Sequence, residues 1–241
     1  MDLSDPTRAV TPTLDGPVLA VLASAGRPLT VGEVASQAAR GSEIGIRRSL
    51  ARLVAQGLVR ATVMGRNTVH QLNRDHLAAG VAEVLAGLRL ELWARLRSEL
   101  GGWQPAPLYA AVFGSAARGD GDEGSDIDLL LVHPPFPGEM PPRRQQETLG
   151  SPLLDAVLKA TLDWRGVRAE PEPWLRQVDR LRVLVQGWTG NDLQVVDLSV
   201  DEWWHPGDGY QGLLADVRRE GVEVARSDKL PPVALTGAAV G

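Results

Sequence analysis

The chain has 241 residues, of which 44% are hydrophobic and 23% charged, and its formal net charge is −5. This composition supplies enough apolar material for real cores, and the length favours two domains. The absence of cysteine excludes disulfides, thiolate metal sites and cysteine nucleophiles, which suits a reducing cytoplasm. No apolar run reaches the length of a membrane span, so we expect a cytoplasmic protein with no membrane partner.

The charge is spread unevenly along the chain. Between Arg27 and Arg74 there are eight Arg and two acidic residues, so this segment carries +6 and the rest of the chain −11. A basic unit joined to an acidic one suggests a different partner for each.

The sequence of the N-terminal third predicts a short polar segment followed by three helices and a hairpin. Residues 1–13 are polar, contain two prolines and are expected to be loose. Three helices are predicted, over 14–25, 31–39 and 43–56. Thr30 and Glu33 form the signal of a capping box for the second helix, Ser42 caps the third, and Gly57 follows its end. Alternating strands over 58–63 and 68–72 flank the turn at 64–67, which predicts a hairpin.

This order of elements over residues 14–75 resembles the winged helix-turn-helix regulators of bacteria. The resemblance implies that the third helix is a recognition helix for the major groove of DNA. DNA contacts would then come from the guanidinium groups of Arg47, Arg48 and Arg52 on that helix and of Arg66 at the wing tip. Two alternatives to DNA binding stay open. The arginines could form a basic helix face that is only solvated, or the winged helix could bind a protein.

A long helix is expected from Arg74 to Leu100, so residues 76–102 are assigned as a linker helix. Its apolar side carries Leu77, Val81, Val84, Leu85, Leu88, Leu92 and Leu96. Such a stripe packs against one of the domains or pairs with its copy in a homodimer through residues 76–100. The segment Gly101–Pro107 is the clearest domain boundary.

Residues 108–132 are the most informative part of the chain. The apolar run 108–113 predicts a buried strand, which Gly114-Ser115 ends, and a second strand over 126–132 begins with Asp126 and Asp128. Side chains alternate along a strand, so both carboxylates leave it on one face. Two adjacent carboxylates repel each other and are costly to bury without a cation. Oxygen ligands of this kind suit Mg²⁺, and the backbone N–H groups of Gly114-Ser115 suit a phosphate.

The motif Gly114-Ser-Ala-Ala-Arg-Gly119, followed by Ser125-Asp-Ile-Asp128, resembles the signature of the DNA polymerase beta-type nucleotidyltransferases and their small bacterial "minimal" branch. The resemblance implies a mixed sheet over residues 103–227, and transfer of a nucleoside monophosphate from a nucleoside triphosphate to an acceptor hydroxyl. Asp126 and Asp128 would hold two Mg²⁺ ions, and Gly114, Ser115 and Arg118 would bind the triphosphate. A surface hairpin with an acidic turn is the alternative for the motif, and a salt bridge with Asp120 or Asp122 is the alternative for Arg118.

The family completes its metal site with a third carboxylate on a later strand. A strand is predicted over 193–200, and Asp197 lies in its middle, where an unpaired charge would be costly. Asp197 is therefore the expected third ligand and catalytic residue, with Asp192 as the competitor. Helices are predicted over 143–164, 173–188 and 210–220, an extended proline-rich loop over 133–142, and a disordered tail over 228–241.

We therefore predict an α+β (mixed α/β) chain with an N-terminal winged helix and a polymerase beta-like nucleotidyltransferase domain. Three functions are compatible with it. The first is a Mg²⁺-dependent nucleotidyltransferase directed to DNA, and the second a transcriptional regulator whose transferase fold only senses nucleotide. The third is an antitoxin-like partner of a HEPN toxin, since minimal nucleotidyltransferases commonly pair with small helical HEPN proteins.

Overall fold

The computed structural model describes residues 1–136, 171–228 and 230. The predicted helix over 143–164 and most of the proposed 228–241 tail lie outside these residues. Two compact units emerge: residues 1–93 with 119–125, and residues 94–118 with 126–241. The first unit therefore includes the loop between the two halves of the Gly-Ser and Asp-x-Asp motif. None of the helices in the described part of the chain is long and apolar enough to cross a membrane.

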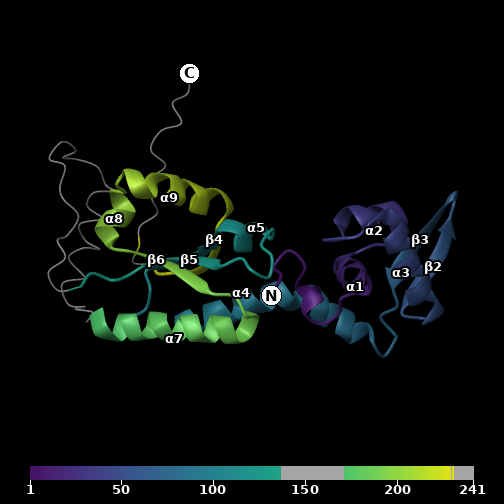
Figure 1. The fold of residues 1–241 in the computed structure, drawn as a ribbon, viewed down its shortest axis with the longest axis horizontal. Helices are drawn as coiled ribbons and strands as arrows, with labels where there is room; N and C mark the ends of the chain where they lie inside the picture. Colours follow the sequence, from purple (N-terminus) through teal and green to yellow (C-terminus); the bar gives the residue numbers. More distant parts are fainter. Residues whose placement is uncertain (137–170, 229, 231–241) are drawn as a thin grey trace, which may run out of the picture. The chain divides into compact units, whose positions relative to one another are not determined.

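The part of the first unit that follows residue 14 begins with three helices, which pack with a three-stranded antiparallel sheet of order β1-β3-β2; Figure 1 labels the helices and strands β2 and β3. Its elements are α1 (Asp15–Ser24), β1 (Leu29–Thr30), α2 (Val31–Gln37), α3 (Glu43–Ala55), β2 (Val59–Met64) and β3 (Asn67–Leu72). The three predicted helices and the hairpin are confirmed as elements. The two-residue strand β1 was not predicted, because so short a segment shows no alternation.

The predicted helix ends are confirmed at α2 and α3. The Thr30 side chain accepts a hydrogen bond from the Glu33 backbone N–H, and the Glu33 carboxylate accepts one from the Thr30 N–H. Ser42 caps α3 by accepting from the N–H of Gly45 at 3.2 Å. Gly57 follows α3 with φ +77°, a left-handed conformation that glycine adopts without steric cost. These caps orient α2 and α3 over a core that includes Val18, Leu22, Val34, Ile46 and Leu50.

The prediction that residues 1–13 are loose is wrong. Leu3 is fully buried, and a short 3-10 helix, η1, runs over Pro6–Ala9. The Asp2 carboxylate accepts hydrogen bonds from the backbone N–H groups of Ser4 and Asp5, both at 3.0 Å. The Asp5 carboxylate accepts one from Arg40 Nε at 2.6 Å. The acidic residues are thus bound to local donors and to a distant arginine, which hydrophobic patterning does not register.

The long helix, α4 (Ala79–Gly101), begins five residues later than predicted, after a series of turns over 73–79. Its apolar side is buried unevenly along its length. Leu85, Leu92 and Leu96 are buried, whereas Val81 and Val84, near the start of the helix, are exposed.

The second unit contains a four-stranded mixed sheet of order β6-β5-β4-β7 (Figure 1). Strands β5 and β6 are parallel, and β4 pairs antiparallel with both β5 and β7. The strands are β4 (Tyr109–Phe113), β5 (Ile127–Val132), β6 (Leu193–Leu198) and β7 (Val222–Arg226), and the helices are α5 (Gly114–Arg118), α7 (Pro171–Thr189), α8 (Val200–Trp204) and α9 (Asp208–Glu220). The expected mixed sheet is confirmed, although the predicted final strand ends at Leu198 because Ser199 caps α8.

The sheet is covered on both faces, with α8 and α9 over one and α7 along the other (Figure 1). Leu130 and Val132 of β5 pack in one cluster with Trp203, Leu214 and Val217 of the first pair of helices. The residues of β5 that alternate with them point to the opposite face, toward α7. Because side chains alternate between the two faces, only Asp side chains on the same face of this sheet can lie close together.

Candidate functional site

The turn between β4 and α5 is built around a glycine and a carboxylate. Gly114 has φ +66°, and a Cβ atom added to it would lie 2.5 Å from Oδ2 of Asp128. Any larger residue would therefore be strained in its backbone and would push the carboxylate aside. The structure thus brings the Gly114-Ser115 turn and the Asp128 side chain together, as the sequence predicted.

The two carboxylates of the motif lie at the start of β5. Asp128 pairs with Phe113 in the β4–β5 register, and Asp126 immediately precedes the strand. They are two positions apart, with only Ile127 between them, so both side chains leave on the same face, with Asp128 half-buried and Asp126 exposed. Burial raises the pKa of Asp128, the negative charge of Asp126 raises it further, and the positive charge of Arg118 opposes both. The pair is therefore electrostatically poised to gain from a cation.

Ser115 is the second residue of α5 and directly follows Gly114, the residue that approaches Asp128. The first N–H groups of a helix have no intrahelical acceptor, so the backbone at Gly114 and Ser115 can donate to an anion. The Ser115 hydroxyl adds a further donor. The arrangement offers phosphate-binding groups on one side and cation-binding oxygens on the other.

Arg118 ends α5, and its Nη1 forms an ion pair with Glu220 Oε1 at 2.8 Å. Glu220 is the last residue of α9 and is mostly buried, while the guanidinium is partly exposed. Sequence reasoning missed this partner, because 102 residues separate the two and no local pattern connects them. The charge of Arg118 still acts on Asp128, so the ion pair holds a cation close to the carboxylate pair.

The loop from 119 to 125 has its own anchors within the first unit. Gly119 has φ +75°, and the guanidinium of Arg89 occupies the space that a Cβ atom would need. The backbone N–H of Ser4 donates to the Gly121 carbonyl at 2.9 Å. Asp122 accepts from the Ser125 hydroxyl at 2.8 Å, which closes the turn before Asp126. The left-handed backbone of Gly119 favours glycine there, and the missing side chain leaves room for the Arg89 guanidinium.

The assignment of Asp197 as the third carboxylate is not supported by its position. It pairs with Leu131 in the parallel register, whereas Asp128 pairs with Gln194, three residues earlier. An odd separation places Asp197 on the opposite face of the sheet from Asp128. There its Oδ2 accepts a hydrogen bond from Nε1 of the fully buried Trp174, at 2.7 Å. Asp197 therefore satisfies a buried indole on α7 and is not brought to the carboxylate pair.

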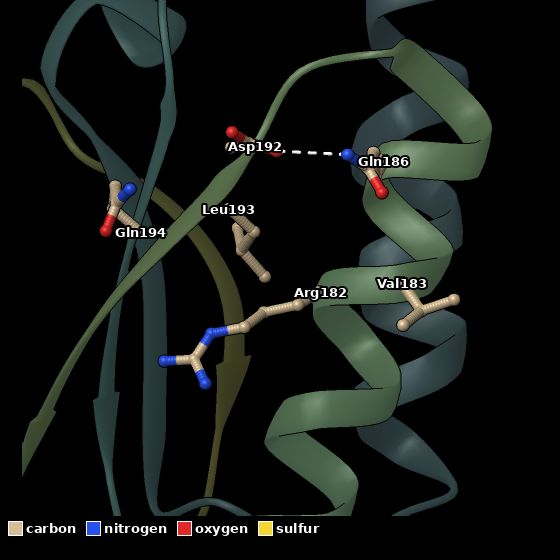
Figure 2. Close-up of a pocket in the computed structure, with 6 residues that line it drawn as sticks. All are labelled: Arg182, Val183, Gln186, Asp192, Leu193 and Gln194. Atoms are coloured by element: carbon tan, nitrogen blue, oxygen red, sulfur yellow. Dashed lines mark hydrogen bonds between the residues drawn. The ribbon is translucent and has the colours of Figure 1, made fainter.

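The competitor, Asp192, lies at the correct end of the sheet. Its carbonyl accepts from the Ile127 N–H at 2.9 Å, so it adjoins the start of β5. Its carboxylate, however, accepts a hydrogen bond from Gln186 Nε2 of α7 at 3.2 Å, drawn in Figure 2. A shallow surface pocket of ≈ 340 Å³ lies here between α7 and the start of β6 (Figure 2). Its lining includes Arg182 and Gln194, and Gln194 is the register partner of Asp128.

The carboxylate oxygens of Asp126 and Asp128 determine which metal ion could bind at this site. Two carboxylates on one face suit a single Mg²⁺, which commonly binds through one or two carboxylates and the phosphates of its substrate. Within residues 1–136, 171–228 and 230, no group of three or more His, Asp or Glu side chains is placed to hold a metal ion. Asp126 and Asp128 are therefore the cation ligands that the described residues offer at this turn, with no third carboxylate grouped with them.

The arginines predicted to contact DNA are mostly paired with carboxylates. Arg47 pairs with Glu43 at 2.7 Å, and Arg52 Nε donates to Asp15 at 3.2 Å. Arg27, Arg40, Arg60 and Arg74 are likewise paired, with Glu33, Asp5, Asp75 and Glu83. Among the eight arginines of the basic segment, only Arg48 and Arg66 have no acidic partner within the described residues.

The charge of the folded unit differs from that of the basic segment. Residues 1–93 and 119–125 contain ten Arg and eleven Asp or Glu, a formal charge of −1. The surplus of +6 is offset because the fold brings acidic residues from before and after the segment into the same unit. Charge alone therefore no longer favours a nucleic-acid partner for this unit.

Comparison with known proteins identifies the domain that contains the carboxylate pair. Residues 92–170 match the family model described as "Nucleotidyltransferase domain", a stretch that includes the Gly114-Ser115 turn and Asp126 to Asp128. No curated protein matches the chain. A solved structure, "Crystal structure of human N-acetylserotonin methyltransferase (ASMT) in complex with SAM", is similar at 20% identity with a TM-score of 0.25. The match covers 42% of this chain and 31% of that one, and at this TM-score it supports no conclusion. A nucleotidyltransferase domain is thus present in the chain.

Proposed function

We propose that the chain is a Mg²⁺-dependent nucleotidyltransferase that moves a nucleoside monophosphate from a nucleoside triphosphate to an acceptor hydroxyl. The observation that carries this proposal is the contact between the Gly114 turn and the Asp128 carboxylate. It unites a phosphate-binding backbone with a cation-binding pair at one point of the sheet. The family match over residues 92–170 supports the same reaction class.

The proposed reaction exchanges one phosphoester bond for another. The acceptor oxygen forms a bond to the α-phosphorus, the bond from that phosphorus to the β-bridging oxygen breaks, and pyrophosphate leaves with the electron pair. The hydroxyl proton passes to solvent or to a basic group. Such transfers depend on positioning and on stabilising charge, with little covalent chemistry by the protein.

Each residue of the site has a role in this reaction. Asp126 and Asp128 would hold Mg²⁺, which neutralises charge on the triphosphate when bound. The N–H groups of Gly114 and Ser115 and the Ser115 hydroxyl would orient the β- and γ-phosphates. Arg118, held by Glu220 at 2.8 Å, would place a positive charge toward the departing pyrophosphate.

Nucleotide binding without turnover is the second candidate, and one observation favours it. Asp197 is bound to Trp174 on the far face of the sheet, so the described residues bring no third carboxylate to the pair. A site with two carboxylates still binds a metal–triphosphate complex but activates an attacking hydroxyl less well. The regulator hypothesis therefore differs from the nucleotidyltransferase hypothesis only in that the bound nucleotide is not transferred to an acceptor.

A DNA-binding role for the first unit, as a winged helix, is retained as a narrower proposal. It is supported by the order of helices and hairpin and by Arg48 on α3 and Arg66 at the hairpin turn, which have no acidic partner in the described part of the chain. Surface ion pairs are weak, so Arg47, whose partner Glu43 is also exposed, can exchange a carboxylate for a phosphate at small cost. The antitoxin-like role with a HEPN partner has no contact among the described residues that favours it.

Label transfer distinguishes the first two candidates. The protein is incubated with Mg²⁺, each of the four α-³²P-labelled nucleoside triphosphates and a cell lysate, and the labelled acceptor is isolated. The proposal expects label in an acceptor with the wild type and none with Asp126→Asn/Asp128→Asn. Triphosphate binding without transfer to any acceptor would establish the sensor role instead.

A further inference from the structure

The loop over residues 119–125 connects the two halves of the candidate site, but it belongs to the first unit. Arg118 before it and Asp126 after it both belong to the second unit. One peptide bond joins Ser125 to Asp126, so the position of the loop limits the positions that the Asp126 backbone can take. The contacts that hold the loop therefore bear on the carboxylate pair.

The N-terminal segment, residues 1–9, holds the middle of this loop. The backbone N–H of Ser4 donates to the carbonyl of Gly121 at 2.9 Å, and Gly121 is buried. Nη1 of Arg8 lies 3.9 Å from Oε2 of Glu123. The loop is thus attached at two points to a segment that is distant in the sequence.

Arg89 of α4 joins the N-terminal segment to the start of the loop. Its Nη2 donates to the carbonyl of Leu3, a residue that is fully buried. Its guanidinium also fills the space in which a side chain at Gly119 would lie. The Nε of Arg89 is buried with no hydrogen-bond partner within the described residues, and an unsatisfied buried donor costs free energy. The contacts of the guanidinium with both segments offset that cost, so the arginine is explained by what it holds together.

Asp126 is the site residue that depends most on the loop. Asp128 is held by the β4–β5 ladder, opposite Phe113, and α5 is held by the ion pair between Arg118 and Glu220. Asp126 precedes β5 and has an exposed side chain, so that ladder does not fix it. Its backbone continues directly from the loop.

We infer that Arg89 is a positioning residue of the candidate site. By holding the loop against the N-terminal segment, it fixes the backbone from which the Asp126 carboxylate reaches the cation. The cation affinity of the second unit therefore depends on the first unit, and the loop is the link between them. The inference rests on the proposed function, because it concerns the same Mg²⁺ site.

Gly119→Ala in the full chain tests this dependence. The new methyl group would displace the Arg89 guanidinium, and the backbone at Gly119 is left-handed, with φ +75°. We expect the Mg²⁺ affinity, measured by titration calorimetry at a fixed triphosphate concentration, to fall about tenfold, a typical coupling between linked sites. Gly124→Ala is the matched control in the same loop, because a Cβ atom there has ordinary contacts, and it should bind Mg²⁺ as the wild type does.

Arg89→Lys makes the same test from the other side of the contact and serves where Gly119→Ala does not fold. Lysine keeps the positive charge but lacks the planar fork that contacts Leu3 and Gly119 together, so the Mg²⁺ affinity should again fall. Circular dichroism confirms that each variant is folded.

Combining Arg89→Lys with Asp126→Asn separates positioning from a general loss of stability. If Arg89 acts through Asp126, adding Arg89→Lys to Asp126→Asn should lower the Mg²⁺ affinity no further. Fully additive losses in the double variant would show that Arg89 does not act through Asp126 and would overturn the inference.

The same measurements separate this inference from the proposed function. A wild type with no Mg²⁺-dependent triphosphate binding would overturn both. A wild type that binds, together with equal Mg²⁺ affinity in Gly119→Ala and Arg89→Lys, would overturn the positioning role and leave the proposed function standing.

Discussion

Asp128 and Asp197 lie on adjacent parallel strands, but their side chains leave the sheet on opposite faces. Asp128 contacts the Gly114 turn, and Asp197 accepts a hydrogen bond from Trp174 at 2.7 Å. The two residues therefore have separable roles: the first belongs to the candidate site, and the second supports the packing of α7 on the sheet.

Asp197→Ala should lower stability without affecting the site. The change leaves the buried Nε1 of Trp174 without its acceptor, which costs about 1–3 kcal/mol of unfolding free energy. Urea denaturation followed by tryptophan fluorescence measures this loss. Binding of Mg²⁺ and triphosphate by the folded variant should equal that of the wild type, and a loss of binding larger than tenfold would return Asp197 to the site.

Gly114→Ala should abolish triphosphate binding while the fold persists. The left-handed conformation costs a non-glycine residue about 1–2 kcal/mol, and the new methyl group would displace the Asp128 carboxylate. Gly124→Ala is the matched control, because a Cβ atom there has ordinary contacts and the backbone is not left-handed. Circular dichroism confirms folding, and calorimetry measures binding. Equal affinity for both variants would argue against the Gly114 turn as a phosphate site.

Arg48→Ala/Arg66→Ala tests the DNA proposal at the two arginines of the basic segment that pair with no carboxylate of the described residues. Each lost phosphate contact reduces the slope of log K against log salt concentration by about 0.9, so we expect the slope to fall by about 2. Fluorescence anisotropy with a labelled duplex measures it. Arg27→Ala removes a guanidinium that pairs with Glu33 and should change nothing. A wild type with no measurable duplex affinity at low salt would end the DNA proposal.

Stability of the first unit should fall in mild acid because of His70. Burial lowers the pKa of this side chain, whose Nδ1 has no hydrogen-bond partner within the described residues. The folded state therefore binds the proton less well than the unfolded state, whose histidine titrates near 6.5. Stability is fully present above that pH and is lost below it, by at most about 1.4 kcal/mol per pH unit.

Denaturation of the wild type and of His70→Gln at pH 8 and pH 5.5 measures this contribution. The difference between the two pH values should be smaller in the variant, since glutamine does not titrate. An identical pH dependence in both proteins would assign the acid sensitivity to other groups.

Local features of the structure were predictable from the sequence, and long-range partners were not. The capping box at Thr30 and Glu33 and the strand that carries Asp128 depend on neighbours a few residues away, so spacing alone located them. The ion pair of Arg118 with Glu220 joins the ends of two distant helices, and nothing in either segment indicates the other.

Two arguments made from the sequence are weakened by the fold, one by geometry and the other by charge. Asp197 was chosen for its place within an apolar strand, but the choice of face depends on the register between β5 and β6, which the sequence does not reveal. The basic segment was judged by its own composition, whereas the fold brings Asp5, Asp15 and Asp75 against its arginines.

Titration calorimetry of the full chain with a triphosphate, in the presence and absence of Mg²⁺, tests the central claim most directly. The account predicts Mg²⁺-dependent binding by the wild type and its loss in Asp126→Asn/Asp128→Asn, with the loop variant Asp122→Asn as a control that retains it. Equal binding by the carboxylate double variant, or no binding by the wild type with any of the four triphosphates, would contradict it.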